Sequence, residues 1–556
     1  MTAARQPAPA ATKLVAAADA STAQTRMWLL DRMLPVGSSY HVNRAVDLRG
    51  PLDAPALAEA LHRCVRRHEA LRTRFELRGT RLRQIITSRE PRLRMVDLRG
   101  LPAADRLADD LVRAAAADPF DLRTAPLLRA LLLRPADEHH VLVLVLHHIV
   151  VDAWSLDQVV REIAADYRAL VAGEPGEPPA PRLQQADHAA WERRALDAGR
   201  MDVHLDYWLR QTADLPALDL FTDRPPPPVP TRRGGLHHFA LDPGLLGALD
   251  ELARREGASR YMVLLAAFNV LLYRWTGRDD VVVGGTSPGR HRPELQDTVG
   301  FFVNMLVLRT RLDGRPTLRE ALRRTAATCQ DAYDHQDAPF ERLVELRGGA
   351  RDPQRHPFFQ VVFQMINMTT ELELPGLAAA FRPPEPAPAM FDLVFTIEPA
   401  GGYVEYATDR YDEASVAALA AGWIAVLREL AADPDRPIEG TPGPVPVPRP
   451  AAAGPATAQA PQQAAGPLEE EVAAMWAEVL GRESIGRDDN FFQLGGHSLL
   501  ATVLLTLLHE RFGVELRLDG FFADPTVAGT AAAVEARRAA AVTVDDALSQ
   551  LLEDLA

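Results

Sequence analysis

Two adjacent histidines and an aspartate stand where a buried strand is expected to meet a helix. Residues 141–146 form an unbroken apolar run, and His147, His148 and Asp152 follow it directly. A short apolar run of this kind predicts a strand buried on both faces. An imidazole can accept or donate a proton near neutral pH. The residue types at this strand end therefore indicate acid–base chemistry.

The residues after Asp152 predict an amphipathic helix. Ser155 and Gln158 have the spacing of a capping box, which marks a helix start. Apolar residues then recur at helical spacing: Leu156, Val159, Val160, Ile163, Tyr167 and Leu170. The expected order is buried strand, short polar loop and helix.

Spacing alone is also compatible with a purely structural role for this cluster. Two adjacent histidines could form a hydrogen-bonded structural pair, and Asp152 could simply begin the loop. A metal site is disfavoured because adjacent side chains diverge and no third ligand stands at a recognisable spacing. A serine hydrolase is disfavoured because no G-x-S-x-G turn precedes a helix here. We expect no metal.

The segment HHIVVDAWS, residues 147–155, resembles the HHxxxDG signature of nonribosomal peptide synthetase condensation domains, which are relatives of chloramphenicol acetyltransferase. Further segments match this family in order: STAQTRMW (21–28), RHEALRTRF (67–75), DHAAW (187–191), VGFFVNMLVLR (299–309), DAPFERLV (337–344) and RHPFFQVVF (355–363). The resemblance covers residues from about 18 to 440.

The resemblance implies an α/β fold of two chloramphenicol-acetyltransferase-like lobes arranged as a V, with a tunnel between them. We expect a first lobe at residues 18–180 and a second at 181–436. By the same resemblance His148 carries the chemistry and His147 supports the structure. Asp152 is expected to pair with Arg290 of the second lobe, so that both hold geometry without touching substrate.

One position departs from the family signature. The family usually has glycine after the aspartate, whereas this chain has Ala153. Glycine reaches positive φ angles that alanine avoids, and such a conformation would strain alanine by about 1–3 kcal/mol. We expect Ala153 to be tolerated and activity to persist.

The C-terminal part predicts a linker and a small helical domain. Residues 437–466 are rich in proline and alanine, which is typical of a semi-extended linker. Val472, Met475, Trp476, Val479 and Leu480 then form one apolar helical stripe. We expect an all-α four-helix domain at 467–540 and a possible docking helix at 541–556.

The motif DDNFFQLGGHSLLA, residues 488–501, resembles that of peptidyl carrier proteins. Its serine, Ser498, would carry covalent 4'-phosphopantetheine. An ordinary serine helix cap after a glycine turn explains the serine but not the whole string. The resemblance implies a phosphopantetheinyl transferase, an upstream donor carrier, an adenylation enzyme acting in trans, and a downstream synthetase or releasing enzyme as partners.

Charge and composition exclude other classes. The net charge is −14, and residues 467–556 contain 16 acidic residues against 6 arginines. A nucleic-acid-binding protein would instead present a basic face. No apolar run of about 18 residues and no secretory signal is evident. We expect a monomeric cytoplasmic protein that binds neither nucleic acid nor membrane.

The sequence thus predicts a condensation–carrier didomain that forms an amide by transferring an acyl or peptidyl group from a carrier thioester to an aminoacyl acceptor. Ester formation with a hydroxyl acceptor and a non-catalytic scaffold that recruits carriers are alternatives. Epimerisation is disfavoured by the domain order. The sequence does not identify donor, acceptor or natural product, nor whether the fused carrier is the acceptor.

Overall fold

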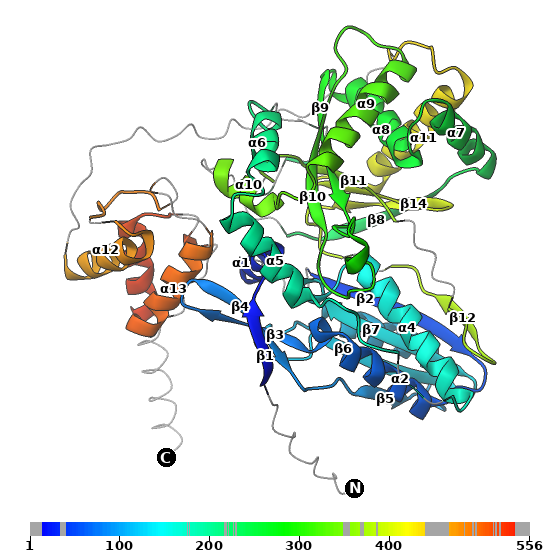
Figure 1. Ribbon diagram of the computed structural model, residues 1–556, viewed down its shortest axis with the longest axis horizontal. Helices are drawn as coiled ribbons and strands as arrows, with labels where there is room; N and C mark the ends of the chain where they lie inside the picture. The colour runs from blue at the N-terminus through cyan, green and yellow to red at the C-terminus, as the bar shows by residue number, and fades with distance from the viewer. Residues whose placement is uncertain are drawn as a thin grey trace, which may run out of the picture.

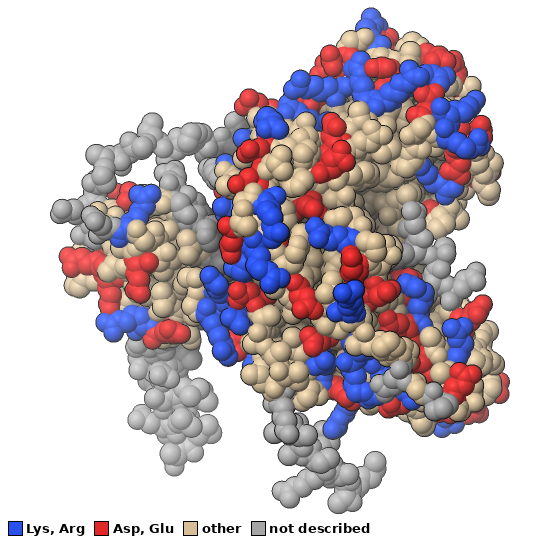
Figure 2. Space-filling view, in the orientation of Figure 1, with Lys and Arg blue, Asp and Glu red and all other residues tan. Residues whose placement is uncertain are grey.

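The computed structural model describes residues 14–33, 40–174, 176, 178–215, 220, 222–225, 227, 231–347, 356–366, 372–384, 387–439, 466–482, 484–491, 494, 498–514, 516, 520–521 and 524–539. Two lobes, each built on a β-sheet with covering helices, lie one above the other in Figure 1, and a small helical unit lies beside them. Figure 2 shows the surface hollowed between the two lobes.

The first lobe is built on a five-stranded sheet with helices on both faces. The strand order is β12 (Ala378–Phe381), β2 (His41–Arg49), β7 (His139–His147), β6 (Leu128–Ala136) and β5 (Leu93–Asp97). One face packs on α2 (Ala54–Arg67) and α4 (Ala153–Val171), and the other on α3 (Ala104–Ala117).

Strand β7 contains the apolar run 141–146, which lacks the alternation of apolar and polar residues that is typical of a half-exposed strand. Leu142, Leu144 and Leu146 pack on the α2 and α4 side, whereas the alternating valines pack on the α3 side: Val141, Val143 and Val145. Successive side chains of a strand point to opposite faces, and both faces of this strand are covered. Every residue of β7 is buried, so the prediction of a doubly buried strand is confirmed.

The second lobe is built on a six-stranded sheet. Its order is β10 (Asn304–Arg311), β9 (Asp280–Ser287), β11 (Val361–Met365), β13 (Leu393–Glu398), β14 (Gly401–Ala407) and β8 (Gly234–Ala240). Its core includes residues of α7 (Pro243–Arg255), α8 (Arg260–Thr276), α9 (Leu318–Asp334) and α11 (Glu413–Ala432).

Helix α11 is the one helix among the described residues that is long and apolar enough to cross a membrane. Its side chains Val416, Leu419 and Trp423 are buried in the core of the second lobe. Trp423 also donates from its indole nitrogen to the carbonyl of Leu264 in α8 at 3.2 Å. These contacts are those of a core helix.

The remaining elements surround the region where the lobes meet. A three-stranded sheet has the order β1 (Leu14–Asp19), β4 (Arg81–Thr87) and β3 (Thr73–Arg78). The helices are α1 (Thr22–Met33), α5 (Gln185–Asp197), α6 (Asp202–Gln211) and α10 (Phe340–Arg347), and the short 3₁₀ turns are η1 (Glu69–Arg72), η2 (His148–Val150) and η3 (Pro293–Leu295).

Two features of the structure differ from the lobe boundaries that were expected from the sequence. Strand β12 falls within the predicted second lobe, yet it pairs antiparallel with β2 and so completes the sheet of the first lobe. Ile438 lies beyond the predicted end at 436, yet it is fully buried in the second-lobe core. Its N–H donates to Pro316 and its carbonyl accepts from Arg274. Long-range pairing, which local sequence does not reveal, sets both limits.

The C-terminal unit is helical. It contains α12 (Pro467–Leu480), α13 (Ser498–Phe512) and a helix over residues 527–539. Val472 and Trp476 of the predicted stripe are fully buried, and Trp476 packs edge-on against Phe491 with ring centroids 4.9 Å apart. Most of the predicted linker, residues 440–465, and the predicted docking helix, residues 541–556, lie outside the described residues.

Candidate active site

His148 lies at the first position of η2, directly after the end of β7. Its backbone N–H donates to the carbonyl of Tyr40 at 2.8 Å, and its own carbonyl accepts from Val151 at 3.2 Å. The imidazole packs edge-on against Phe301, with ring centroids 5.0 Å apart. Its Nδ1 is enclosed and has no hydrogen-bond partner among the described residues, whereas the residue as a whole is partly exposed. The accessible ring nitrogen is therefore Nε2.

Burial lowers the pKa of His148 below its ordinary value of 6.5, although the negative charge of Asp152 favours the protonated form. An imidazole with a lowered pKa stays neutral at neutral pH. The ring is therefore available to accept a proton or a hydrogen bond at Nε2.

His147 points away from this position and is fully buried. Its Nδ1 accepts from the backbone N–H of Ile149 at 3.1 Å, which leaves the ring proton on Nε2. That Nε2 faces Oδ1 of Asp31 in α1 at 3.2 Å and donates to it. His147 thus joins the end of β7 to α1, while Nδ1 of His148 has no hydrogen-bond partner within the described residues.

Asp152, and not Ser155, caps the following helix. Helix α4 begins at Ala153, and Oδ1 of Asp152 accepts from the N–H of Ser155 at 2.8 Å. The predicted Ser155–Gln158 capping box is therefore wrong. Asp152 satisfies an N–H group at the helix start and its negative charge suits the helix dipole, as a cap does.

The predicted pairing of Asp152 with Arg290 is present in the structure. The Nη1 atom of Arg290 donates to Oδ2 of Asp152 at 2.6 Å, and the two side chains are 0% (Asp152) and 1% (Arg290) exposed. The same carboxylate oxygen accepts from the N–H of Phe302 at 3.1 Å. Arg290 also lies over the Phe302 ring, 4.3 Å from its centroid. An arginine of the second lobe is thus locked against the helix that follows His148.

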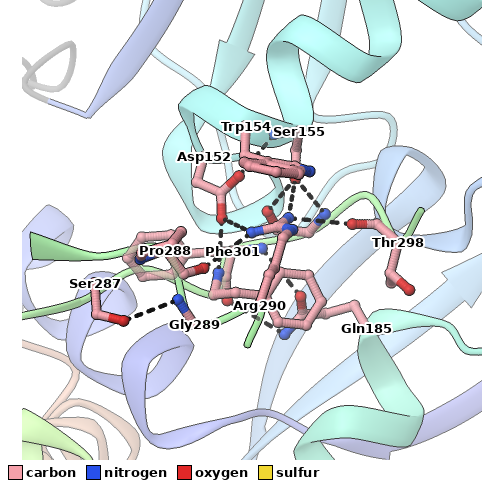
Figure 3. Close-up of polar contacts among 12 residues, drawn as sticks. Asp152, Trp154, Ser155, Gln185, Ser287, Pro288, Gly289, Arg290, Thr298 and Phe301 are labelled. Carbon is pink, nitrogen blue, oxygen red and sulfur yellow. Dashed lines mark hydrogen bonds and ion pairs between the residues drawn. The ribbon is translucent and has the colours of Figure 1, made fainter. Parts of the chain in front are cut away.

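Ser155 adds further hydrogen bonds to the Asp152–Arg290 contact between the lobes (Figure 3). Its Oγ donates to the carbonyl of Gly300 at 2.8 Å and accepts from the N–H of Gly300 at 3.0 Å and from Nη2 of Arg290 at 2.5 Å. One donor and two acceptor sites are all that a hydroxyl offers. The loop that carries Phe301 is therefore fixed at the residue before it.

Ala153 occupies the first turn of α4. The described non-glycine residues with positive φ are Ala103, Asp214, Arg232 and Arg315, and Ala153 is not among them. The left-handed conformation that would require glycine is not used at this position. The departure from the family signature introduces no backbone strain here.

A pocket that Phe301 helps to line holds a second set of titratable groups. It is lined by the start of α1, by His188, Trp191 and Glu192 of α5, and by some of the residues in the segments 289–304 and 336–341. Burial lowers the pKa of His188 to about 4 and raises the pKa of Glu192 to about 7. Oε2 of Glu192 accepts from the N–H of Thr22 at 2.8 Å, so this carboxylate joins α5 to α1.

Comparison with known protein families agrees with this geometry. Residues 17–441 match the model of the condensation domain, and residues 470–534 match that of the phosphopantetheine attachment site. The chain belongs to the condensation domain family. Its members in nonribosomal peptide synthetases are acyltransferases that form peptide bonds.

The curated relatives are much longer proteins. The chain is 39% identical over 422 residues to the chondramide synthase cmdD of Chondromyces crocatus, which covers 74% of this chain and 11% of that protein. It is 39% identical over 426 residues to the phosphinothricin tripeptide synthetase PhsC of Streptomyces viridochromogenes, covering 74% and 39% respectively. The chain therefore spans only a part of these synthetases.

Solved structures share the fold. The X-domain from teicoplanin biosynthesis is 30% identical, with a TM-score of 0.69 over 76% of this chain and 96% of that one. The SgcC5 protein from Streptomyces globisporus is 31% identical, with a TM-score of 0.63 over 75% and 100% respectively. The chain thus has the two-lobed chloramphenicol-acetyltransferase-like architecture followed by a carrier domain.

The carrier domain fits the group that its family attaches. Ser498 is the first residue of α13, and a helix N-terminus favours a negative phosphate because its N–H groups and dipole point there. A serine hydroxyl can form the phosphodiester bond to 4'-phosphopantetheine. When attached, this group supplies a thiol that holds an acyl or aminoacyl chain as a thioester. A phosphopantetheinyl transferase must load it.

Several residues of the condensation site were not predicted from the sequence. Asp31 fixes His147, and its place in the same helix as the first family motif is the signal that could have found it. Gly300 and Phe302 fix Ser155 and Asp152 through backbone groups. Backbone partners carry no side-chain signature, so spacing could not reveal them.

Proposed function

We propose that this chain forms an amide bond by transferring an acyl or peptidyl group from an upstream carrier thioester to an amine acceptor on its own carrier domain. The observation that supports this proposal best is the accessible Nε2 of His148 beside the region where the two lobes meet. His147 and Asp152 bind elsewhere, so they leave that nitrogen free for substrate.

His148 acts on the attacking amine in this proposal. As the nitrogen attacks the thioester carbonyl, the neutral imidazole accepts the proton that the amine loses. If the imidazole is already protonated before the attack, it instead donates a hydrogen bond to the thioester carbonyl oxygen as negative charge develops on that oxygen. The thiolate leaves and takes up a proton. Because a thioester is already reactive toward amines, holding both chains in line supplies much of the acceleration. Asp152 and Arg290 hold geometry.

The proposal that the fused carrier domain presents the acceptor rests on the position of α13. This helix, which begins at Ser498, lies against α1, and α1 also supplies Asp31 to the His147 contact (Figure 1). The excess of acidic residues over residues 467–556 suits docking on an arginine-containing surface. An acceptor chain on Ser498 would then enter beside the same helix that braces the active-site strand.

The remaining partners follow from this role. A donor carrier, an adenylation enzyme acting in trans and a downstream synthetase or releasing enzyme would act with the chain, as a monomer in the cytoplasm. A docking role for residues 541–556 belongs to the same proposal. Loss of complementation by the partner after deletion of these residues is the expected result, and unchanged complementation would contradict it.

Two other functions are the alternatives to this proposal. The similarity to an X-domain that forms a complex with OxyB supports a recruiting scaffold without chemistry. A hydroxyl acceptor would yield an ester, and it would depend more strongly on His148 as a base because an alcohol is the poorer nucleophile.

Transfer assays separate these functions. The primed chain is offered an acyl-loaded donor carrier with either an aminoacyl or a hydroxyacyl group on Ser498, and the product is measured by intact-protein mass spectrometry. Amide formation that His148→Ala abolishes supports the proposal. Ester formation alone, or binding of carriers without transfer, would favour the alternatives.

A further inference from the structure

The ring of Phe301 contacts the active-site histidine and also lines the pocket beside α5. It packs edge-on against the His148 imidazole, with ring centroids 5.0 Å apart. It also lines the cavity formed by the start of α1, by α5 and by the segments 289–304 and 336–341, which we call the Phe301 pocket. Because one ring adjoins both places, the space that it fills would join the pocket to His148 if the ring were removed.

The backbone of Phe301 is held on both sides (Figure 3). Its N–H donates to Oε1 of Gln185 at 3.0 Å, and Nε2 of Gln185 donates to its carbonyl at 3.4 Å. The N–H groups of both neighbours, Gly300 and Phe302, donate to the first turn of α4 and to its cap. A shift of this loop that moved the ring would break these bonds. The ring is therefore a fixed part of the pocket wall.

The Phe301 pocket is small and reaches the surface. It encloses about 50 Å³. Because one water molecule needs about 10–15 Å³ of such space, the pocket has room for about three to five water-sized groups. His291 and Arg292, which line it, are exposed, so the pocket opens to solvent. An aliphatic side chain such as that of valine or leucine fits this room, whereas an aromatic side chain exceeds it.

Charged groups at the pocket are paired with other parts of the wall. Asp337 pairs with His291 at 3.1 Å, and the Arg292 guanidinium lies over the Trp191 ring, 4.1 Å from its centroid. Oε2 of Glu192 accepts from the backbone N–H of Thr22, which begins α1. These contacts leave aromatic and aliphatic surface for a ligand to meet.

Two titratable groups in the wall indicate how the pocket acts on charge. Burial and nearby positive charges lower the pKa of His188 to about 4. Burial raises the pKa of Glu192 to about 7. Both shifts favour the neutral form of the group. A substrate side chain in the pocket is subject to the same desolvation, so a neutral side chain is favoured there over a cation or an anion.

The pocket lies on the side of the first lobe that meets the fused carrier. Thr22 of α1 lines the pocket, and α13, which begins at Ser498, lies against α1. Glu341 of α10 also lines the pocket and pairs with Arg26 of α1 at 3.3 Å. The pocket and the carrier thus share contact with one helix. Of the two substrates, the acceptor on Ser498 is the one that approaches beside this helix.

We propose that the Phe301 pocket binds the side chain of the acceptor amino acid, and that the Phe301 ring sets the largest side chain that condensation admits. This inference rests on the proposed function. The acceptor amine meets His148 while its side chain enters the pocket past the Phe301 ring. The preferred acceptor therefore carries a neutral aliphatic side chain of about the size of valine or leucine. Phe301 is a specificity-determining residue in this proposal.

The test varies the acceptor and keeps the donor constant. The full chain is primed on Ser498 with aminoacyl coenzyme A, so that it carries alanine, valine, leucine, phenylalanine or tryptophan. A donor carrier supplies an acetyl group, and intact-protein mass spectrometry gives the single-turnover rate constant of transfer. Two further pairs compare charge at similar length: glutamine against glutamate, and methionine against lysine.

Variants connect the preference to the ring. We expect wild type to transfer to leucine about tenfold or more faster than to tryptophan, and to each neutral member of the two pairs faster than to its charged partner. Phe301→Ala should bring the leucine-to-tryptophan ratio close to one, and Phe301→Leu should retain part of it. Phe381→Ala is the matched control, since Phe381 is a partly buried phenylalanine of β12 outside the pocket, and it should leave the ratio unchanged.

Two results would overturn the assignment of the ring. One is a wild type without any preference for acceptor size. The other is a Phe301→Ala variant that slows every acceptor equally and keeps the wild-type ratio, which would indicate a role in the fold or in placing His148 alone.

A donor series separates the two substrates. The donor carrier is loaded with acetyl, hexanoyl or phenylacetyl groups while Ser498 carries alanine. Phe301→Ala should leave the relative rates of these donors unchanged. A changed order of donors together with an unchanged acceptor series would place the pocket on the donor side and contradict the proposal.

A binding measurement keeps the inference separate from catalysis. Isothermal titration of the full chain, left unprimed at Ser498, with amide-linked pantetheine analogues of leucine and tryptophan needs no turnover. We expect the leucine analogue to bind wild type about tenfold more tightly, and Phe301→Ala to remove the difference. If no acceptor condenses but this difference is present, the proposed function fails and the pocket assignment stands. Equal binding of the two analogues to wild type would refute the assignment.

Discussion

Replacing Arg290 by methionine tests the ion pair that joins the lobes behind His148. Methionine keeps the length of the side chain but removes its charge and its hydrogen bonds to Asp152, Ser155 and the carbonyl of Thr298. Asp152 would then be a fully buried carboxylate with backbone donors but no cation. Removing one partner of a buried pair costs about 3–5 kcal/mol. We expect Arg290→Met to lower the free energy of unfolding by that amount.

A double-mutant cycle isolates the pair. Asp152→Asn retains an oxygen that can cap α4, and asparagine is a good helix cap. Without the carboxylate, the loss of Arg290 leaves no buried charge, so the double variant should be more stable than the sum of the single losses predicts. We expect a coupling energy of about 1–3 kcal/mol.

Urea denaturation of the full chain, followed by tryptophan fluorescence, measures these energies for the transition that includes both lobes. Transfer activity is measured on the same samples under conditions where each variant is folded. It should fall in Arg290→Met because the loop that places Phe301 against His148 loses the hydrogen bond from Arg290 to the carbonyl of Thr298 and the contact of Arg290 with the Phe302 ring. An unfolding transition unchanged from the wild type, or additive effects in the double variant, would refute the argument.

Three further predictions concern single residues. Ala153→Gly should leave kcat/KM within about twofold of the wild type, because Ala153 lies in a normal helical turn; recovery of activity from an inactive wild type would contradict this. Glu192→Gln should stabilise the chain at about pH 8 by up to about 3 kcal/mol and have little effect at pH 5, as judged by denaturation at both pH values. The sign follows because burial raises the Glu192 pKa from 4.5 to about 7, so the proton-linked stability is fully present below 4.5 and is lost as the pH rises through 7. Because burial lowers the pKa of His148, kcat/KM should stay level near neutral pH and fall only in mild acid. If kcat/KM already begins to fall above pH 7 as the pH is lowered, the imidazole is not neutral at neutral pH and the prediction is wrong.

The local parts of this site could be read from the sequence. Strand β7 was predictable because six consecutive apolar residues need two covered faces, and α4 because its apolar residues recur at helical spacing. The start of α4 was predicted wrongly, since the hydroxyl of Ser155 makes tertiary hydrogen bonds to Gly300 and Arg290 instead of capping the helix.

Contacts between distant segments could not be read from the sequence without a known family. The pairing of Asp152 with Arg290 was expected only from the family resemblance, because 138 positions separate the two residues. The Asp31 contact to His147 and the addition of β12 to the first sheet are also set by packing of the whole chain. Periodicity describes one element at a time, so it carries no information on such pairings.

The measurement that tests the central claim most directly is acyl transfer onto the fused carrier. The chain is primed on Ser498, loaded with an amino acid, and mixed with an acyl-loaded donor carrier, and the mass of the intact protein is followed for wild type and His148→Ala. The account predicts a mass increase equal to the acyl group in the wild type, at a rate independent of dilution with unloaded chain, and its loss in the variant. A primed and loaded wild-type chain that gains no acyl group, or a variant that gains it at the wild-type rate, would contradict the account.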